Sequence, residues 1–201
     1  MVRKAKKRGT RQIAASVRRS APGIDIVSIF ARYGDGSQGA AAVSHVPLST
    51  TPLVFLDFDG VLHPDSVYLE RGRLVLRSDG IRFFEWAPLL QNALAQHPEI
   101  RIVLSTSWVS LGGNFAKAQL PQVLRERVIG ATSEGADSGF EWLTRYRQIM
   151  QYVNRHRCQR WLAIDDDVEH WPDAHRGPLV ATDGDWGLAE PGKSDELAAK
   201  L

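Results

Sequence analysis

The ten residues LVFLDFDGVL, at positions 53–62, constrain the fold more than any other stretch of the chain. A continuous apolar run of this kind, directly after Pro52, is typical of a strand covered on both faces, as in a parallel sheet. The run ends in Asp57 and Asp59, and Gly60 permits a turn that lets both carboxylates converge on one point. Open α/β sheets place their ligands at the carboxyl ends of their strands. Because two converging carboxylates repel each other unless a cation or a proton lies between them, this stretch predicts a functional site.

Two further apolar runs also end in polar side chains. Residues 100–104, IRIVL, precede the hydroxyls of Ser105 and Thr106, which could also serve simply to cap the end of a strand. Residues 161–164, WLAI, precede three consecutive acids at positions 165–167. Three carboxylates at one strand end repel each other unless a cation is bound. If the strands are parallel, all these polar residues lie at one edge of the sheet.

The segment 138–156 is expected to form a helix before the third of these strands. Ser138 and Glu141 match a capping box, and the apolar residues that follow have the spacing of a buried helix face. These apolar residues are Trp142, Tyr146, Ile149 and Val153. A helix that precedes a parallel strand runs antiparallel to it, so its amino end lies at the same sheet edge as the carboxylates. Early residues of this helix can therefore reach the candidate site.

The remaining pattern predicts short elements between these segments. A hairpin is expected at residues 67–76, closed by a turn that contains Gly72. A helix is expected at 83–96 with Pro88 in its first turn, and another at 121–128. The inward residues of the latter are expected to be Leu120, Val123, Leu124 and Val128. A last strand-to-loop segment is expected at 182–188, and a helix from Ser194.

The order of these motifs resembles the haloacid dehalogenase (HAD) superfamily of phosphohydrolases. That superfamily has Asp-x-Asp-Gly after a first strand, Ser or Thr after a second, a basic residue near a helix start, and paired acids after a third strand. The resemblance covers residues 53 to about 190 and implies an α/β, three-layer Rossmann-like fold with a mainly parallel sheet. It also implies a β-hairpin flap after the first strand. The roughly forty residues between successive motifs leave no room for a large cap domain.

The resemblance also implies what the site does. Asp57 would be the nucleophile that forms an aspartyl-phosphate, and Asp59 would be the acid and base that serves the leaving group and then water. The phosphate would be held by Ser105, or by Thr106 as a close alternative, together with a basic residue. The cofactor would be Mg²⁺, and its ligands would come from Asp57, Asp59, Asp165 and Asp166.

The basic residue departs from the commonest pattern of the superfamily, which most often has Lys there. The only lysine between the second and fourth motifs is Lys117. On the expected helix, Arg145 lies roughly 70° from the centre of the buried stripe and Arg147 roughly 130°, so Arg145 is the preferred candidate. Arginine cannot act as an acid or base at this position, but it can hold phosphate bidentately.

The charge distribution divides the chain into two parts. The net charge is only +2, yet the first twenty residues hold eight basic side chains and no acid. We therefore expect a basic, partly flexible arm at residues 1–50 and a HAD-like phosphohydrolase domain at 51–201. The arm is either a solvated tail or a segment that contacts polyanions through their phosphates.

The substrate is expected to be a phosphorylated molecule. The segments 102–108 and 163–167 resemble the HAD domains attached to bacterial RNA-repair proteins, and with the basic arm they favour a phosphatase acting on nucleic-acid ends or another macromolecular phosphate. The alternatives are a phosphatase for nucleotides or sugar phosphates and a non-catalytic module that binds phosphate or a partner. No apolar stretch is long enough to span a membrane, and the single Cys158 suits a reducing compartment, so a cytoplasmic protein is expected. The sequence does not indicate an oligomeric state.

Overall fold

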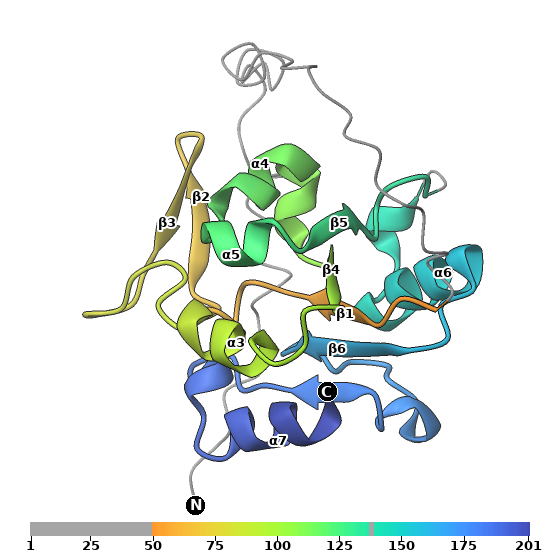
Figure 1. Cartoon of the computed structure of the whole chain (residues 1–201). Coiled ribbons are helices and arrows are strands. Elements are labelled where there is room, and N and C mark those ends of the chain that lie inside the picture. Colours follow the sequence, from red (N-terminus) through yellow and green to blue (C-terminus); the bar gives the residue numbers. More distant parts are fainter. Residues whose placement is uncertain (1–49, 137–138) are drawn as a thin grey trace, which may run out of the picture.

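A five-stranded parallel sheet forms the centre of the computed structural model, which describes residues 50–136 and 139–201 (Figure 1). The strand order is β5-β4-β1-β6-β7, and every neighbouring pair is parallel. The five strands are β1 (Leu53–Leu56), β4 (Arg101–Leu104), β5 (Val128–Ala131), β6 (Trp161–Asp165) and β7 (Leu179–Ala181). The central position of β1 between β4 and β6 explains why its four residues are all buried.

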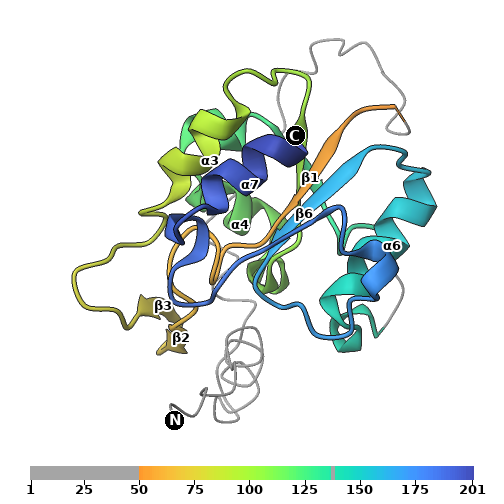
Figure 2. The same ribbon diagram turned by 90° about the horizontal axis from the view of Figure 1, so that it is seen from below.

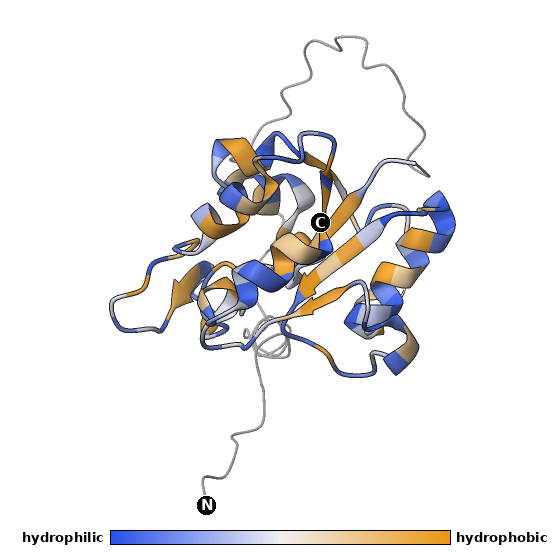
Figure 3. Cartoon of the chain, turned by 60° about the horizontal axis from the view of Figure 1, so that its bottom comes forward, coloured by the Kyte–Doolittle hydropathy of each residue, from blue (hydrophilic) through white to orange (hydrophobic). Residues whose placement is uncertain are grey.

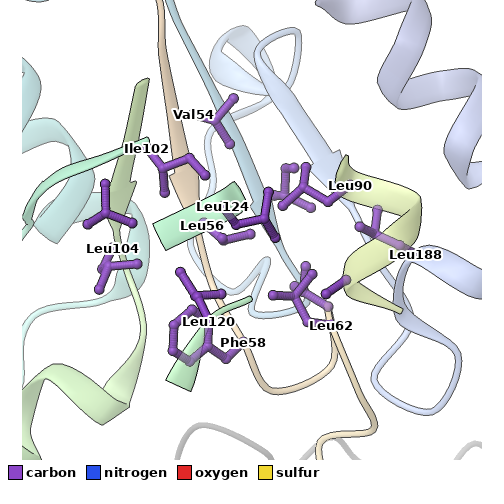
Figure 4. Packing of buried hydrophobic residues seen from close by; sticks show 14 of the residues in the cluster. Val54, Leu56, Phe58, Leu62, Leu90, Ile102, Leu104, Leu120, Leu124 and Leu188 are labelled. Atoms are coloured by element: carbon purple, nitrogen blue, oxygen red, sulfur yellow. The ribbon is translucent and has the colours of Figure 1, made fainter. Parts of the chain in front are cut away.

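Helices cover both faces of this sheet, which confirms the predicted three-layer α/β fold. Side chains alternate along each strand, so Val54 and Leu56 face one cluster while Leu53 and Phe55 face another. The first cluster is completed by α3 (Ala87–Leu94), α4 (Gly113–Gln119), α5 (Gln122–Arg125) and α7 (Lys193–Lys200). The second is completed by α6 (Arg145–His156). Apolar residues concentrate in the strands (Figure 3), and side chains of the first cluster, among them Leu56, Leu90 and Leu124, gather between the sheet and its helices (Figure 4).

The β-hairpin predicted after the first strand is present. It consists of β2 (Val67–Glu70) and β3 (Arg73–Leu76), paired antiparallel with Val67 opposite Leu76. It extends from the body of the molecule on the side where β1 ends (Figure 2). Within residues 50–136 and 139–201, no larger insertion interrupts the fold, since β1 and β4 are joined only through this hairpin and α3. The expectation that a large cap domain is lacking holds for this part of the chain.

The helix before β6 begins later than the sequence predicted. It starts at Arg145, and the Thr144 side chain caps it by accepting a hydrogen bond from the Arg147 N–H. Ser138 of the predicted capping box lies outside the described residues. Trp142 was expected on the buried face, but it belongs to a separate 3₁₀ turn, Phe140–Trp142, and is 66% exposed. The other predicted inward residues do lie on the inner face, with Ile149 and Val153 buried and Tyr146 packed against the same cluster.

Three other boundaries also differ from the prediction. The segment expected as one helix at 121–128 is the single turn of α5 followed by β5, so Val128 begins a strand and Val123 is exposed rather than inward. Helix α3 is shorter than the predicted 83–96, and β7 precedes the segment 182–188 rather than lying in it. The helix expected from Ser194 is α7. The other 3₁₀ turns are Ser107–Leu111, Asp173–His175 and Gly187–Ala189.

The predicted arm, residues 1–50, lies outside the described residues except for its last residue. Its division from residues 51–201 and its partners stay predictions. Among the helices of the described residues, none is both long and apolar enough to cross a bilayer.

Candidate active site

Adjacent strand ends place the predicted residues in one row. In the register of the sheet, Leu56 of β1 lies opposite Leu104 of β4 and Ile164 of β6. The next residue along each strand is therefore Asp57, Ser105 or Asp165. Each of the three continues the side-chain alternation of its strand toward the face that α6 covers. The sequence thus predicted correctly which residues meet at this edge.

Arg145 joins the row from the first turn of α6. Its Nη2 donates to Asp57 Oδ2 at 3.2 Å, and its Nε lies 3.0 Å from Asp165 Oδ2. The second contact is an ion pair by distance, but the Nε–H is not oriented for a hydrogen bond. Burial alone would lower the pKa of Arg145, but the surrounding carboxylates, first of all Asp57, outweigh that effect and raise it. The guanidinium therefore stays charged and bridges two of the three strand ends.

The site holds more acidic than basic side chains. Within the described residues, Arg145 is the only buried arginine or lysine, whereas four acids are buried, namely Asp57, Asp59, Asp165 and Asp166. Burial is the largest cause that raises the pKa of Asp57, to about 6, and the charge of Asp59 adds to it, while Arg145 lowers it. Burial likewise raises the pKa of Asp165 well above its ordinary value. A further cation bound among these acids would therefore be stabilised by their excess negative charge.

Three of these acids form a group that suits a divalent metal ion. Asp57, Asp165 and Asp166 each offer one carboxylate oxygen, and these oxygens all lie within 4.8 Å of one another. Asp165 Oδ2 is buried and accepts no hydrogen bond in the described part of the chain. A set of carboxylate oxygens is the donor set that Mg²⁺ prefers. These residues therefore fit the predicted Mg²⁺, and Asp59, which is not in the group, has no comparable support as a ligand.

Gly60 makes the close approach of this group possible. Its φ of +71° is a conformation that other residues rarely adopt, and a Cβ there would lie 2.5 Å from Asp166 Cγ. The Thr182 hydroxyl donates to the Gly60 carbonyl at 2.7 Å and fixes the turn. The Asp-x-Asp-Gly pattern therefore needs its glycine for two reasons, the backbone angle and the position of Asp166.

The two candidate hydroxyls after β4 are in different surroundings. Thr106 accepts a hydrogen bond from the Trp108 N–H at 3.3 Å, and its hydroxyl also bonds to Asp57, which lowers the pKa of that carboxyl. Ser105 is fully buried, and its Oγ has no hydrogen-bond partner among the described residues. A buried hydroxyl without a partner is costly, so Ser105 is ready for an acceptor that a ligand would supply. Both hydroxyls remain candidates for phosphate binding.

Asp59 lies beside the acidic group and has its own partners. Its Oδ1 is 3.1 Å from His63 Nε2 and accepts from Trp108 Nε1 at 3.0 Å. The same indole N–H lies 3.1 Å from Oδ2. The sequence did not indicate that Trp108, which is buried, donates to Asp59. It missed His63 altogether, although a histidine four residues after the second acid of the motif is a visible signal.

The alternatives to Arg145 lie elsewhere. Arg147 is exposed on the outer side of α6. The Lys117 ammonium donates to the carbonyl of Val128, where β5 begins. Lys117 therefore lies toward the amino ends of the strands, whereas the carboxylates lie at the carboxyl ends. Of the three basic residues considered, Arg145 is the one that the fold brings to the carboxylates.

Comparison with known proteins gives one match. A family model described as the HAD domain in Swiss Army Knife RNA repair proteins matches residues 53–192. This range takes in the whole sheet and every residue of the site described above. No curated protein and no solved structure was matched.

Proposed function

Because this chain belongs to the family of HAD domains in Swiss Army Knife RNA repair proteins, we propose that it is a Mg²⁺-dependent phosphomonoesterase that acts on nucleic-acid ends. The observation that supports this most is the row of Asp57, Ser105 and Asp165, with Arg145 paired to both acids. Phosphoryl transfer needs an in-line nucleophile, neutralisation of the phosphoryl oxygens and a proton for the leaving group. The row and its neighbours can supply all three.

The reaction takes two steps. Asp57 attacks phosphorus, the ester P–O bond breaks, and Asp59 gives its proton to the leaving oxygen, which leaves an aspartyl-phosphate. Asp59 then takes a proton from water, whose oxygen attacks phosphorus and releases Asp57 and inorganic phosphate. Arg145 and the hydroxyls of Ser105 and Thr106 hold the phosphoryl oxygens throughout.

The acidic group has a separate task. Mg²⁺ held by Asp57, Asp165 and Asp166 would neutralise charge on the phosphoryl group and orient it toward the nucleophile. Asp59 was also a candidate ligand, but its carboxylate faces His63 and Trp108, so we assign it to proton transfer alone.

Two exposed tryptophans support a nucleic-acid substrate. Trp142 is 66% exposed and precedes Arg145 by three residues, and Trp186 is 62% exposed in the loop after β7. That loop adjoins the site, because Gly184 packs against Asp166: a Cβ added at Gly184 would lie 3.3 Å from Asp166 Oδ2. The Gly184 carbonyl also accepts a hydrogen bond from the Asp65 N–H, which connects the loop to the segment after the first motif. Exposed aromatic rings beside a phosphate site can stack with unpaired bases, at about 1–3 kcal/mol for each base.

The reaction is tested with p-nitrophenyl phosphate. The wild-type chain should hydrolyse it with Mg²⁺ and lose activity in EDTA, and Asp57→Asn should be inactive but folded. Turnover by the folded D57N variant would refute the assignment of the nucleophile. An inactive wild-type chain that still binds phosphate would support the non-catalytic alternative.

The substrate class is tested with oligonucleotides that carry a 3′- or a 5′-phosphate, compared with mononucleotides and sugar phosphates. The substitutions Trp142→Ala and Trp186→Ala should each raise KM for the preferred oligonucleotide several-fold and leave KM for p-nitrophenyl phosphate unchanged. Val123→Ala, which trims an exposed apolar residue near the opposite edge of the sheet, is the matched control. Equal kcat/KM for sugar phosphates and oligonucleotides would favour a small-molecule phosphatase. Deletion of residues 1–45 measures what the basic arm adds.

A further inference from the structure

We propose that His63 is a positioning residue for Asp59, and that it fixes which carboxylate oxygen of Asp59 exchanges the proton in the reaction. This inference rests on the proposed function, since it concerns the acid and base of that reaction. It is drawn from the hydrogen bonds around Asp59, which lies outside the group of acids that suits a metal ion.

The contacts of the two ring nitrogens of His63 show which of them carries the proton. Its Nδ1 lies 3.4 Å from the backbone N–H of Phe84, which can only donate, so Nδ1 accepts. The proton of the neutral ring is therefore on Nε2, which lies 3.1 Å from Asp59 Oδ1 and donates to it. The main chain of a distant segment thus selects the tautomer that can hold the carboxylate.

The surroundings of His63 leave it little freedom to turn. Its side chain is fully buried. The rings of Phe83, Phe84 and Trp108 contact it edge-on, with centroids 5.2, 5.0 and 5.8 Å away. The main chain adds a further restraint, because the Gly60 N–H donates to the His63 carbonyl at 2.8 Å. A rotation of the imidazole would break its contacts at both nitrogens within an apolar environment, which is costly.

Two donors contact the carboxylate of Asp59, and His63 is the one that distinguishes its two oxygens. His63 Nε2 donates to Oδ1, whereas the Trp108 indole N–H is shared almost equally between Oδ1 at 3.0 Å and Oδ2 at 3.1 Å. When Asp59 is neutral, Oδ1 must keep a lone pair for His63 Nε2, so the proton is on Oδ2. Oδ2 is then the oxygen that gives a proton to the leaving group and later takes one from water. Without the His63 donor, either oxygen could carry the proton and the carboxyl could rotate.

The substrate's leaving group provides a readout specific to this role. Phenyl phosphate needs a proton on its leaving oxygen, whereas 2,4-dinitrophenyl phosphate releases a stable anion. The ratio kcat/KM covers the steps up to formation of the aspartyl-phosphate, so it reports on proton donation by Asp59. His63→Phe keeps a ring and removes the donor, and His63→Gln keeps an N–H donor near the position of Nε2. Trp108→Phe removes the second donor.

For H63F we expect kcat/KM to fall roughly 10- to 100-fold with phenyl phosphate, which is part of the usual contribution of a general acid, and by less than about threefold with the dinitrophenyl ester. H63Q should recover most of the loss, and W108F, which loses a donor that serves both oxygens, should change the ratio of the two esters less than H63F does. An equal loss with both esters, or no loss, overturns the inference, as does a folded H63Q that behaves like H63F. If H63F does not fold, His63→Asn takes its place in the comparison with H63Q, because the shorter amide reaches only the position of Nδ1 and cannot donate to Asp59.

The proposed function is tested in parallel by D57N, which should lose activity with both esters. If D57N is inactive and H63F keeps the wild-type ratio of the two esters, the proposed function stands and the role of His63 falls. If wild type hydrolyses neither ester, both fall together.

Discussion

Replacement of the proposed nucleophile should stabilise the metal-free protein. Asp57 is buried among other acids, and its pKa is raised from 3.8 to about 6, chiefly by burial. Because the folded state holds this proton more tightly than the unfolded state, the contribution of Asp57 to stability is greatest at low pH. It is lost as the pH rises from about 4 to about 6, where the folded chain must accept a buried charge. Asp57→Asn has the shape of the neutral acid at every pH and avoids this loss.

The size of the effect follows from the pKa. A rise from 3.8 to about 6 corresponds to about 3 kcal/mol at pH 8, at about 1.36 kcal/mol for each pKa unit. At pH 4.5 the same relation leaves only about 1 kcal/mol. For a domain of this size, 3 kcal/mol corresponds to an increase of roughly 6–12 °C in Tm. The attraction of Arg145 to Asp57 is included in the pKa, and Arg145 keeps Asp165 as a partner in the variant.

The assay is thermal and urea unfolding of wild type and D57N in EDTA at pH 4.5, 6 and 8. The difference in unfolding free energy should grow with pH between 4.5 and 6 and then level off. Asp79→Asn changes an exposed aspartate in the same way and should show no such trend. A D57N variant that is less stable than wild type at pH 8, or a difference that does not change with pH, would refute the reasoning. With saturating Mg²⁺ the order should reverse, because the ion stabilises the wild-type carboxylates.

Three further predictions concern the neighbours of Asp57. Mg²⁺ should raise the Tm of wild type more than that of Asp166→Asn, and an equal rise would exclude Asp166 as a ligand. Arg145→Lys keeps the charge but loses the planar guanidinium, which contacts Asp57 and Asp165 through two separate nitrogens, so kcat/KM for p-nitrophenyl phosphate should fall roughly 10- to 100-fold; full activity would show that the charge alone suffices. Gly60→Ala should lower both Tm and Mg²⁺ affinity, because its Cβ would meet Asp166. Gly80→Ala, at a similar φ of +76° with nothing within 4 Å, should affect Tm far less and Mg²⁺ affinity not at all.

The strand ends could be predicted because their signal is local. In β1, β4 and β6 an apolar run changes abruptly to acids or hydroxyls, and parallel strands bring such ends together without further information. Arg145 was also placed correctly, although the start of its helix was wrong. Its angle to the buried face depends on Ile149 and Val153, which are well inside α6, and not on where the helix begins.

The errors arose where a helical spacing continued into a segment that is not helical. Trp142 has the correct spacing from Tyr146, but Leu143 and Thr144 between them are extended, with ψ near 150°. The first residue of β5, Val128, was likewise assigned to the helix before it. A strand of four residues, VIGA, has no periodicity that distinguishes it from one more helical turn. Its pairing with β4, which the sequence does not display, makes it a strand.

The partners of Asp59 could not have been predicted in the same way, because they come from separate parts of the chain. Trp108 follows Asp59 by 49 positions and reaches it from the turn after β4. His63 is close in sequence, but it meets Asp59 only because the turn at Gly60 brings the two residues side by side in an isolated bridge. A buried carboxylate must have donors, so the sequence predicts that Asp59 has partners, while the packing of the aromatic residues around it decides which they are. The arrangement around the proposed acid and base is therefore a property of the tertiary structure, whereas the proposed nucleophile follows from the motif alone.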